Sequence, residues 1–380
     1  MVRSRGAARG VGWTLVLIVA FVAAAFPWLQ DRWDQWSTTL QDEATQVSPF
    51  SGVAAPDGKS ESILIIVEDQ QGAVASMVLG SLSESGTPVF AIIPNSIFTL
   101  LPGYGEFKIL ETTLFEDEQL ARVTVENMLG ARIDRVLALG PGDISAALHT
   151  DIDVELSTEL AVRDESGAVR VVFDSGRQIL DGDQVETLMF VRGESDLLDW
   201  TERQSSAWTA ILTAIQQRPN IADLLAPTSP SADLLKAIAK GPRVVLVPAQ
   251  PVSPGSEGEG FVLSGSAAED FVVSRIPSLK LFDGSRPRVE LLNGNGGIQS
   301  TRSIAEALIR AGFRIVRTDN ATNFDFEHTL VVAQGRGAKQ VAEVAARVIS
   351  VDEVLIELDT PSGVIDISII VGKDINSGEV

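Results

Sequence analysis

Short apolar runs alternate along the chain with segments in which apolar residues recur at helical spacing. The runs are rich in β-branched residues and are closed by Gly, Ser or Pro, as buried strands are. The strands predicted in this way are Ser62 to Val67, Met77 to Leu82, Val89 to Ile93, Ile133 to Leu139 and Val169 to Phe173. Helical spacing predicts helices over Asp117 to Leu129, Asp181 to Val191 and Asp199 to Gln217. This alternation predicts an α/β fold built on a mixed sheet.

A second unit of the same kind begins after Asp283-Gly284-Ser285. Its predicted elements are strand Arg288 to Leu292, helix Thr301 to Ala311, strands Phe313 to Arg317 and Thr329 to Ala333, helix Ala338 to Ile349, and strands near Val354 and over Val364 to Val371. We therefore expect a larger domain at 61–284 and a small α/β C-terminal domain at 285–375. The loop PAQPVSPGSEGEG, ahead of the boundary, is interpreted as a flexible rim.

The N-terminal part is apolar in a different way. From Val11 to Leu29 the chain has 19 residues without a charge, close to the ~20 that a helix needs to cross a bilayer. Arg3, Arg5 and Arg9 precede this run and Asp31 follows it, so the positive-inside rule places the N-terminus in the cytoplasm. The predicted order is a cytoplasmic tail at 1–10, one transmembrane helix at 11–30 and a polar stalk at 31–60, with the bulk of the chain outside the plasma membrane.

A cleaved signal peptide is the alternative interpretation of this N-terminal run. Such a peptide ends in a small-x-small cleavage site, and none precedes the bulky stretch FPWLQDRW. An uncleaved signal-anchor is therefore the favoured prediction.

Charge and composition exclude several classes of protein. The net charge is -21, and without residues 1–30 the chain has 27 basic and 51 acidic residues, a surface that repels nucleic acid. There is no cysteine, which rules out disulfides and thiolate metal sites. His149 and His328 are the only histidines, too few for a histidine-rich zinc site, so no metal site is predicted.

Several segments resemble a known pair of modules, the LytR-CpsA-Psr (LCP) family of envelope proteins followed by the small LytR C-terminal domain. The first resemblance covers roughly residues 61–215 and lies in SILIIV, SMVLGSL, AIIP, TVENMLGARIDRVLAL, ILDGDQVETLMFVR and TERQ. The second covers most of residues 286–375 and lies in RVELLNGNGG, IAEALIRAGFRIV, NFDFEHTLVV and IDISIIVGKD. The second set of motifs is the more specific one.

The resemblance implies a function as well as a fold. Active members of the LCP family transfer glycopolymers from a polyprenyl pyrophosphate carrier to peptidoglycan. Their chemistry requires arginines that clamp the pyrophosphate oxygens and carboxylates that hold a divalent metal such as Mg²⁺. Members that resemble this chain are anchored by one N-terminal span, with the domain outside the cytoplasm.

This chain departs from the family at the positions that carry the chemistry. Asn95 and Ser96 stand where the family has an arginine and an aspartate after the Ile-Pro that ends a strand. Ala75 stands at a family carboxylate position, and Trp200 at an arginine position. Because losing one preorganised charged group lowers a rate by about 100- to 1000-fold, the resemblance implies a degenerate site and leaves the catalytic residues unknown.

Three cations remain at family positions and are the predicted ligand-binding residues. They are Arg192 in FVRGESD, Arg203 in TERQ and Lys108 in FKI. The alternative is that they form surface ion pairs with neighbouring acids such as Glu194, which contribute little to stability.

The favoured hypothesis is a pseudoenzyme without a cofactor that binds lipid-linked glycan, peptidoglycan or other envelope proteins. The alternative is an active glycopolymer phosphotransferase that uses Mg²⁺ in a rearranged site. A transcriptional regulator that contacts DNA directly is disfavoured by the predicted topology and the acidic surface.

Two further patterns have an ordinary structural interpretation and a functional one. Apolar residues of the predicted helices either pack in the core, which is favoured, or line a groove for a polyprenyl chain; they are Leu120, Val123, Met128, Leu188, Phe190 and Trp208. The segment Asn293 to Gly297 is expected to form a tight strand-to-helix turn rather than an anion or dinucleotide site, because Gln299 stands where a dinucleotide motif has its last glycine.

Overall fold

The computed structural model describes residues 60–83, 86–115, 119–255, 258–351, 354–357 and 363–375. All of them fall within one compact unit, residues 48–380. The predicted tail, the predicted membrane helix and the predicted stalk, apart from Ser60, lie outside the described residues. No helix among the described residues is long and apolar enough to cross a membrane.

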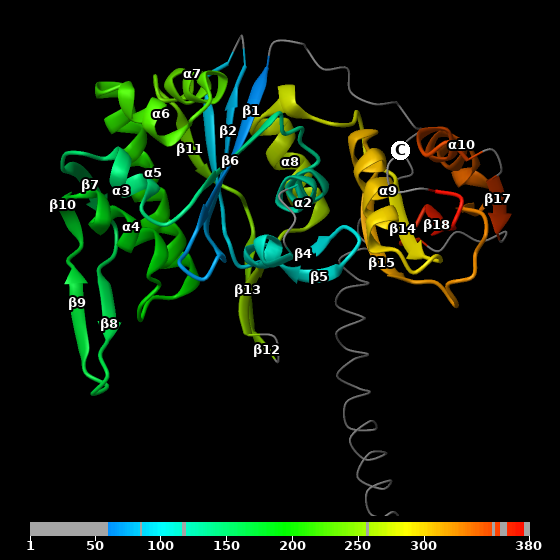
Figure 1. Ribbon diagram of the computed structural model, residues 1–380, viewed down its shortest axis with the longest axis horizontal. Helices are drawn as coiled ribbons and strands as arrows, with labels where there is room; N and C mark the ends of the chain where they lie inside the picture. Colours follow the sequence, from blue (N-terminus) through cyan, green and yellow to red (C-terminus); the bar gives the residue numbers. More distant parts are fainter. Residues whose placement is uncertain are drawn as a thin grey trace, which may run out of the picture. The chain divides into compact units, whose positions relative to one another are not determined.

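A mixed sheet of five strands in the order β11-β3-β2-β1-β6 is the centre of the larger domain (Figure 1). Strand β1 (Glu61–Glu68) is antiparallel to β2 (Val74–Leu82) and parallel to β6 (Arg135–Leu139). Strand β3 (Val89–Ile93) is antiparallel to β2 and parallel to β11 (Arg243–Leu246). The predicted α/β class and mixed sheet are therefore confirmed.

Helices cover both faces of this sheet, so its strands are apolar on both sides. Ile63, Ile65 and Val67 of β1 point into one core, and Leu64 and Ile66 point into the other. The first core contains residues of α3 (Asp143–Ala147), α4 (Gly182–Phe190), α5 (Leu197–Gln217), α6 (Asn220–Leu225) and α7 (Ser229–Ile238). The second contains residues of α2 (Leu120–Leu129), α8 (Gly265–Arg275), and the 3-10 turns η1 (Ile109–Phe115) and η2 (Pro277–Leu279).

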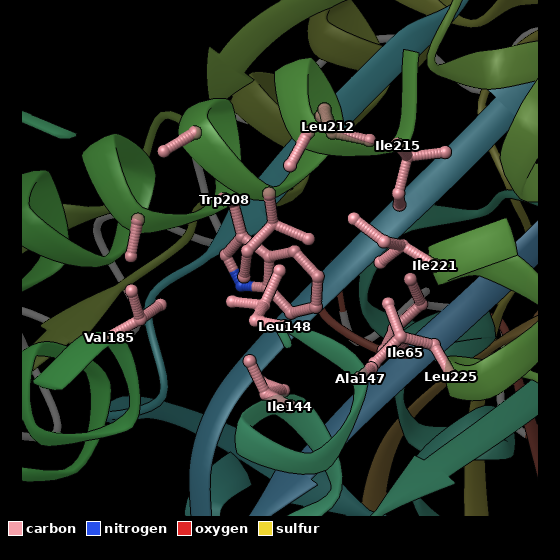
Figure 2. Close-up of a cluster of buried hydrophobic side chains, with 14 of the residues drawn as sticks. Ile65, Ile144, Ala147, Leu148, Val185, Trp208, Leu212, Ile215, Ile221 and Leu225 are labelled. Atoms are coloured by element: carbon pink, nitrogen blue, oxygen red, sulfur yellow. The ribbon is translucent and has the colours of Figure 1, made fainter. Parts of the chain in front are cut away.

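Trp208 of α5 lies in the middle of the first core. Figure 2 shows its indole surrounded by Leu148, Leu212, Ile144 and Ile65. The ring also packs at a tilt on Phe90 of β3, with ring centroids 5.4 Å apart. A large aromatic ring between helix and sheet fixes the distance between those two layers.

Smaller strands lie around the central sheet. One sheet has the order β12-β13-β4-β5, in which β4 (Ile97–Leu101) and β5 (Gly105–Lys108) form a hairpin. Strands β12 (Gln250–Gly255) and β13 (Gly258–Val262) form the second hairpin of that sheet. The interpretation of PAQPVSPGSEGEG as a flexible rim is therefore wrong for most of its length, because β12 and β13 pair this Pro- and Gly-rich segment into a hairpin of the sheet.

Two further antiparallel pairs complete the larger domain. Strand β7 (Ile152–Leu156) pairs with β10 (Gly176–Leu180), and β8 (Leu160–Arg163) pairs with β9 (Val169–Phe173). The β8–β9 hairpin projects beyond the body of the domain (Figure 1).

The C-terminal region has its own sheet and its own core. The strand order is β15 (Arg314–Asn320), β14 (Arg288–Asn293), β18 (Ile367–Val371), β16 (Leu330–Gln334) and β17 (Val354–Glu357). Helices α9 (Ile298–Arg310) and α10 (Lys339–Val348), with the short turn η3 (Arg336–Ala338) before α10, cover the face that carries Val289, Leu291, Ile367 and Ile369. The predicted elements of this region are all present.

The Gly-rich segment between β14 and α9 forms a tight turn, as expected. The Asn293 side-chain oxygen accepts hydrogen bonds from the backbone N–H groups of Asn295 and Gly296. Gly296 has φ +80°, a conformation in which glycine is favoured. The Asn293 side-chain oxygen is therefore bound within the turn.

Ile65→Ala tests the packing of the first core. Ile65 is 1% exposed, so the substitution removes buried methyl groups and leaves a cavity, and we expect a loss of about 2–5 kcal/mol in the free energy of unfolding. Urea denaturation measures this loss. Val169→Ala is the control, because Val169 is 53% exposed and should cost less than about 0.5 kcal/mol; equal losses in both variants would contradict the assigned core.

Candidate functional site

A β-bulge in strand β2 creates the first feature of the site. Val67 pairs with Ser76 and Glu68 pairs with Val74, which leaves Ala75 as an extra residue between them. A bulged residue is released from the ladder and its polar groups are redirected. The Ala75 carbonyl oxygen accepts one hydrogen bond from Asn95 Nδ2 at 2.7 Å and another from Gln204 Nε2 at 2.6 Å.

Further side chains complete a group that we call the amide cluster, in which Trp200 is half-buried and the other members are buried: Ala75, Asn95, Ser96, Trp200 and Gln204. Gln204 Nε2 and Trp200 Nε1 both donate to the Met189 carbonyl oxygen, each at 3.0 Å. Ser96 Oγ donates to Asn95 Oδ1 at 3.2 Å. The cluster is thus internally hydrogen-bonded and carries no formal charge, and burial makes each of these bonds expensive to break.

The amide cluster contains all four positions at which the family resemblance predicts a lost charged group. Ala75, Asn95, Ser96 and Trp200 come from β2, from the end of β3 and from α5, so the fold brings these distant positions together. Neutral hydrogen bonds stand where the resemblance implies arginines and carboxylates. Sequence reasoning left Gln204 without a role, and its contact to Ala75 shows its place in the cluster.

Arg203 lies next to the amide cluster and fixes a loop. Its side chain is fully buried, and its guanidinium donates to Ser195 Oγ at 2.7 Å and to the carbonyl oxygens of Arg192 and Val191 at 2.9 and 3.3 Å. Burial lowers the pKa of Arg203, and the Asp199 carboxylate acts in the opposite direction. Arg203 Nε has no hydrogen-bond partner among the described residues.

The loop that Arg203 holds carries the second predicted cation. Arg192 Nε donates to the Ser195 carbonyl oxygen at 2.8 Å, and its guanidinium also pairs with the Glu259 carboxylate of β13. Arg192 is 38% exposed and Glu259 is 46% exposed. Arg192 is therefore anchored on one side and accessible to solvent on the other.

Lys108 lies near Gly258, the residue before Glu259 in β13. Its ammonium lies 5.1 Å from the centroid of the Phe98 ring, and a side-chain carbon placed on Gly258 would lie 3.8 Å from Lys108 Nζ. The structure thus brings Arg192 and Lys108 to the adjacent residues Gly258 and Glu259. Together with Arg203, which binds the Arg192 carbonyl, they form what we call the cationic rim.

The neighbouring loop is tied to the β8–β9 hairpin. Gly193 has φ +64°, and a side-chain carbon there would lie 2.1 Å from the Ala161 carbonyl oxygen. The Glu194 backbone N–H donates to that same oxygen at 2.9 Å, and the Glu194 carboxylate pairs with Arg163. Glu194 therefore pairs with the hairpin, and Arg192 pairs with Glu259 instead. Sequence reasoning missed this partner because it lies 67 residues from Arg192.

The apolar residues considered for a polyprenyl groove lie in separate cores. Leu188 and Trp208 belong to the first core, Met128 to the second, and Val123 to the C-terminal core. Core packing accounts for these four side chains. The described residues also contain no group of three or more His, Cys, Asp or Glu side chains that is placed to hold a metal ion.

Comparison with known families identifies the C-terminal region. Residues 286–374 match the family described as LytR cell envelope-related transcriptional attenuator. The prediction of a LytR C-terminal domain is confirmed over these residues. A search of curated proteins gives no match.

Three solved structures are examples of those to which this chain is similar. TagV of B. subtilis is 18% identical with a TM-score of 0.49, over 59% of this chain and 99% of that one. The LytR-CPS2A-psr family protein YwtF (TagT), solved with octaprenyl pyrophosphate lipid, is 18% identical with a TM-score of 0.45, over 62% and 94%. A transcriptional regulator from Enterococcus faecalis is 14% identical with a TM-score of 0.48, over 60% and 90%. Values this low assign neither a fold nor a function to this chain.

Asn95→Asp tests whether the amide cluster is closed to water. The substitution turns the donor to Ala75 into a carboxylate oxygen that faces a carbonyl, and we expect a loss of about 1–3 kcal/mol at neutral pH. Burial raises the pKa of the new carboxyl in the folded state. The folded state then binds more protons than the unfolded state, so the loss grows as the pH rises and shrinks as it falls.

Urea denaturation at pH 7 and pH 5 measures this effect. Asn220→Asp makes the same chemical change at an exposed position at the start of α6, and its stability should vary with pH as that of the wild type does. An Asn95→Asp deficit that is equal at both pH values would mean that water solvates the cluster.

Proposed function

We propose that this protein is a membrane-anchored envelope protein whose larger domain binds the pyrophosphate of a lipid-linked glycan without normal turnover. One observation supports this proposal above the others: a neutral, closed amide cluster lies beside a cationic rim. The rim offers charged donors to an anion, while the cluster has no charged group for a leaving phosphate or a metal, and its amide donors are bound to the Ala75 and Met189 carbonyl oxygens.

The C-terminal match and the sequence motifs support the cell-envelope setting. The matched family is described as cell envelope-related, and the motifs of residues 61–215 resemble the LCP family, whose active members use polyprenyl pyrophosphate carriers. The proposed localisation has residues 1–10 in the cytoplasm, residues 11–30 in the plasma membrane and the rest outside. Peptidoglycan and other envelope proteins are further candidate partners, and nucleic acid is not.

An active phosphotransferase remains the competing proposal. It requires Mg²⁺ and new catalytic residues, and acids near the rim such as Asp196 and Asp199 would have to supply them. The Asp196 carboxylate already caps the start of α5, where it accepts from the Asp199 backbone N–H at 2.8 Å. Capping a helix in this way is a sufficient structural role for Asp196.

Substitutions of Arg192 and Glu259 should change the affinity for geranylgeranyl pyrophosphate in opposite directions. Quenching of tryptophan fluorescence measures this affinity. Arg192→Ala removes a charged donor and should weaken binding about tenfold. Glu259→Gln removes a competing carboxylate from an exposed pair, which is worth about 0–1 kcal/mol, and should tighten binding by about two- to fivefold. Arg177→Ala is the control, since Arg177 is 71% exposed and pairs with Asp153 in the β7–β10 pair, a different sheet from that of Glu259.

The same samples decide between binding and turnover. Each variant is incubated with a polyprenyl pyrophosphate-linked sugar and Mg²⁺, and the pyrophosphate link is followed by mass spectrometry. Intact substrate that stays bound to the protein supports the proposal. Cleavage by the wild type that disappears in Arg192→Ala would establish the phosphotransferase. Affinities unchanged in both Arg192→Ala and Glu259→Gln would exclude the rim as the binding site.

The absence of cysteine makes the proposed topology directly testable. A single cysteine at Val169→Cys, which is exposed in the β8–β9 hairpin, gives the chain one reactive thiol. A membrane-impermeant maleimide should label it in intact cells. Ala7→Cys is the matched variant in the proposed cytoplasmic tail and should be labelled only after the cells are permeabilised; the reverse pattern would overturn the proposed orientation.

A further inference from the structure

Helix α2 is enclosed on all sides by two cores. All ten of its residues are buried. Ala121, Val125 and Leu129 pack in the second core of the larger domain, whereas Val123 packs in the core of the C-terminal domain. The helix therefore belongs to both domains, and its position is determined by both.

Polar groups of α2 bind the C-terminal domain at its edge strand. The Asn127 amide donates to the Ile315 carbonyl oxygen and accepts from the Ile315 backbone N–H, both at 2.9 Å. A side-chain amide thereby satisfies both backbone groups of one residue of β15, as a neighbouring strand would. Arg122 pairs with Glu126 on its own helix and with Glu306 of α9.

Arg286, at the start of the C-terminal region, closes the same junction. Its guanidinium donates to the carbonyl oxygens of Asn127 at 2.7 Å and Phe313 at 2.6 Å. Asn127 lies in the last turn of α2, where carbonyl groups lack helical partners and favour a cation. Burial lowers the pKa of Arg286 to about 9, so it carries its charge at neutral pH.

The β4–β5 hairpin, which carries Lys108, rests on the C-terminal domain at its turn. Leu100 of β4 packs against the C-terminal core. Gly103 in the turn has φ +90°, and a side-chain carbon there would lie 3.6 Å from the Arg302 Cα. Strand β15 contacts both β4 and β5, so the hairpin is supported at the end opposite to Lys108.

We infer that the C-terminal domain supports the β4–β5 hairpin by packing against its turn, a role that we call the buttress. This support positions Lys108 and Phe98 for the anion, and that second half of the inference rests on the proposed function. Leu100 and Phe98 lie two residues apart on the same face of β4, and Phe98 pairs with Lys108 in the strand register. The hairpin is the outer half of the four-stranded sheet, with β5 at the edge, so contacts at its turn add to the support that β13 gives to β4. Asn127 and Arg286 are positioning residues that act through this support.

Asn127→Ala and Glu306→Gln in the full-length protein test the buttress by hydrogen–deuterium exchange of residues 97–108. Asn127→Ala removes both hydrogen bonds to Ile315 and should speed exchange of residues 97–108 about tenfold. Glu306→Gln weakens one ion pair across the junction and should speed it about twofold. Glu343→Gln is the control, because Glu343 pairs with Lys339 within α10 and should leave exchange unchanged.

Geranylgeranyl pyrophosphate affinity, measured on the same variants, separates this inference from the proposed function. We expect affinity to fall in parallel with faster exchange, about threefold or more for Asn127→Ala. Faster exchange in β15 alone would overturn the buttress. Faster exchange of 97–108 with wild-type affinity would overturn the positioning of Lys108. If the wild type binds no pyrophosphate, the proposed function fails while the exchange result still decides the buttress.

Discussion

The Ala75 carbonyl oxygen joins three segments that are far apart in the chain. The bulge in β2 turns this oxygen away from the strand ladder, and a buried carbonyl must find donors elsewhere. Asn95 at the end of β3 and Gln204 on α5 supply them. Arg203 directly precedes Gln204 on the same helix and binds the Arg192 carbonyl oxygen, so the helix that is held at Ala75 also holds the loop that carries Arg192.

The neutral composition of the cluster explains how it is stable without a ligand. Buried arginines and carboxylates at these positions would need a bound anion or metal to compensate their charge, because an unpaired buried charge is strongly destabilising. Amide and indole groups need only hydrogen bonds, and the Ala75 and Met189 carbonyl oxygens provide these. The hydrogen bonds of the neutral cluster are therefore made within the protein, without a bound ligand.

Local patterns predicted most of the elements, and contacts between distant residues account for what they missed. Strand Val89 to Ile93 and helix Asp199 to Gln217 have a clear period, and both are present. Strand β12 was missed because Pro and Gly hide a segment whose strand forms by pairing with β13. The bulge at Ala75 and the pairing of Arg192 with Glu259 depend on contacts across many residues, which no local period encodes. The family motifs marked Ala75, Asn95 and Trp200, but only the fold shows their bonds.

The charge of the chain decides what kind of anion the rim can hold. A strongly acidic protein repels a free anion at long range, but this repulsion is screened beyond ~8 Å at physiological salt. At contact, Arg192 already has the single carboxylate of Glu259, an exposed pair of low energy. An anion with one charge gains little by displacing it. A pyrophosphate carries several adjacent charges, so in the proposed function it competes with this carboxylate for Arg192 better than a singly charged anion does.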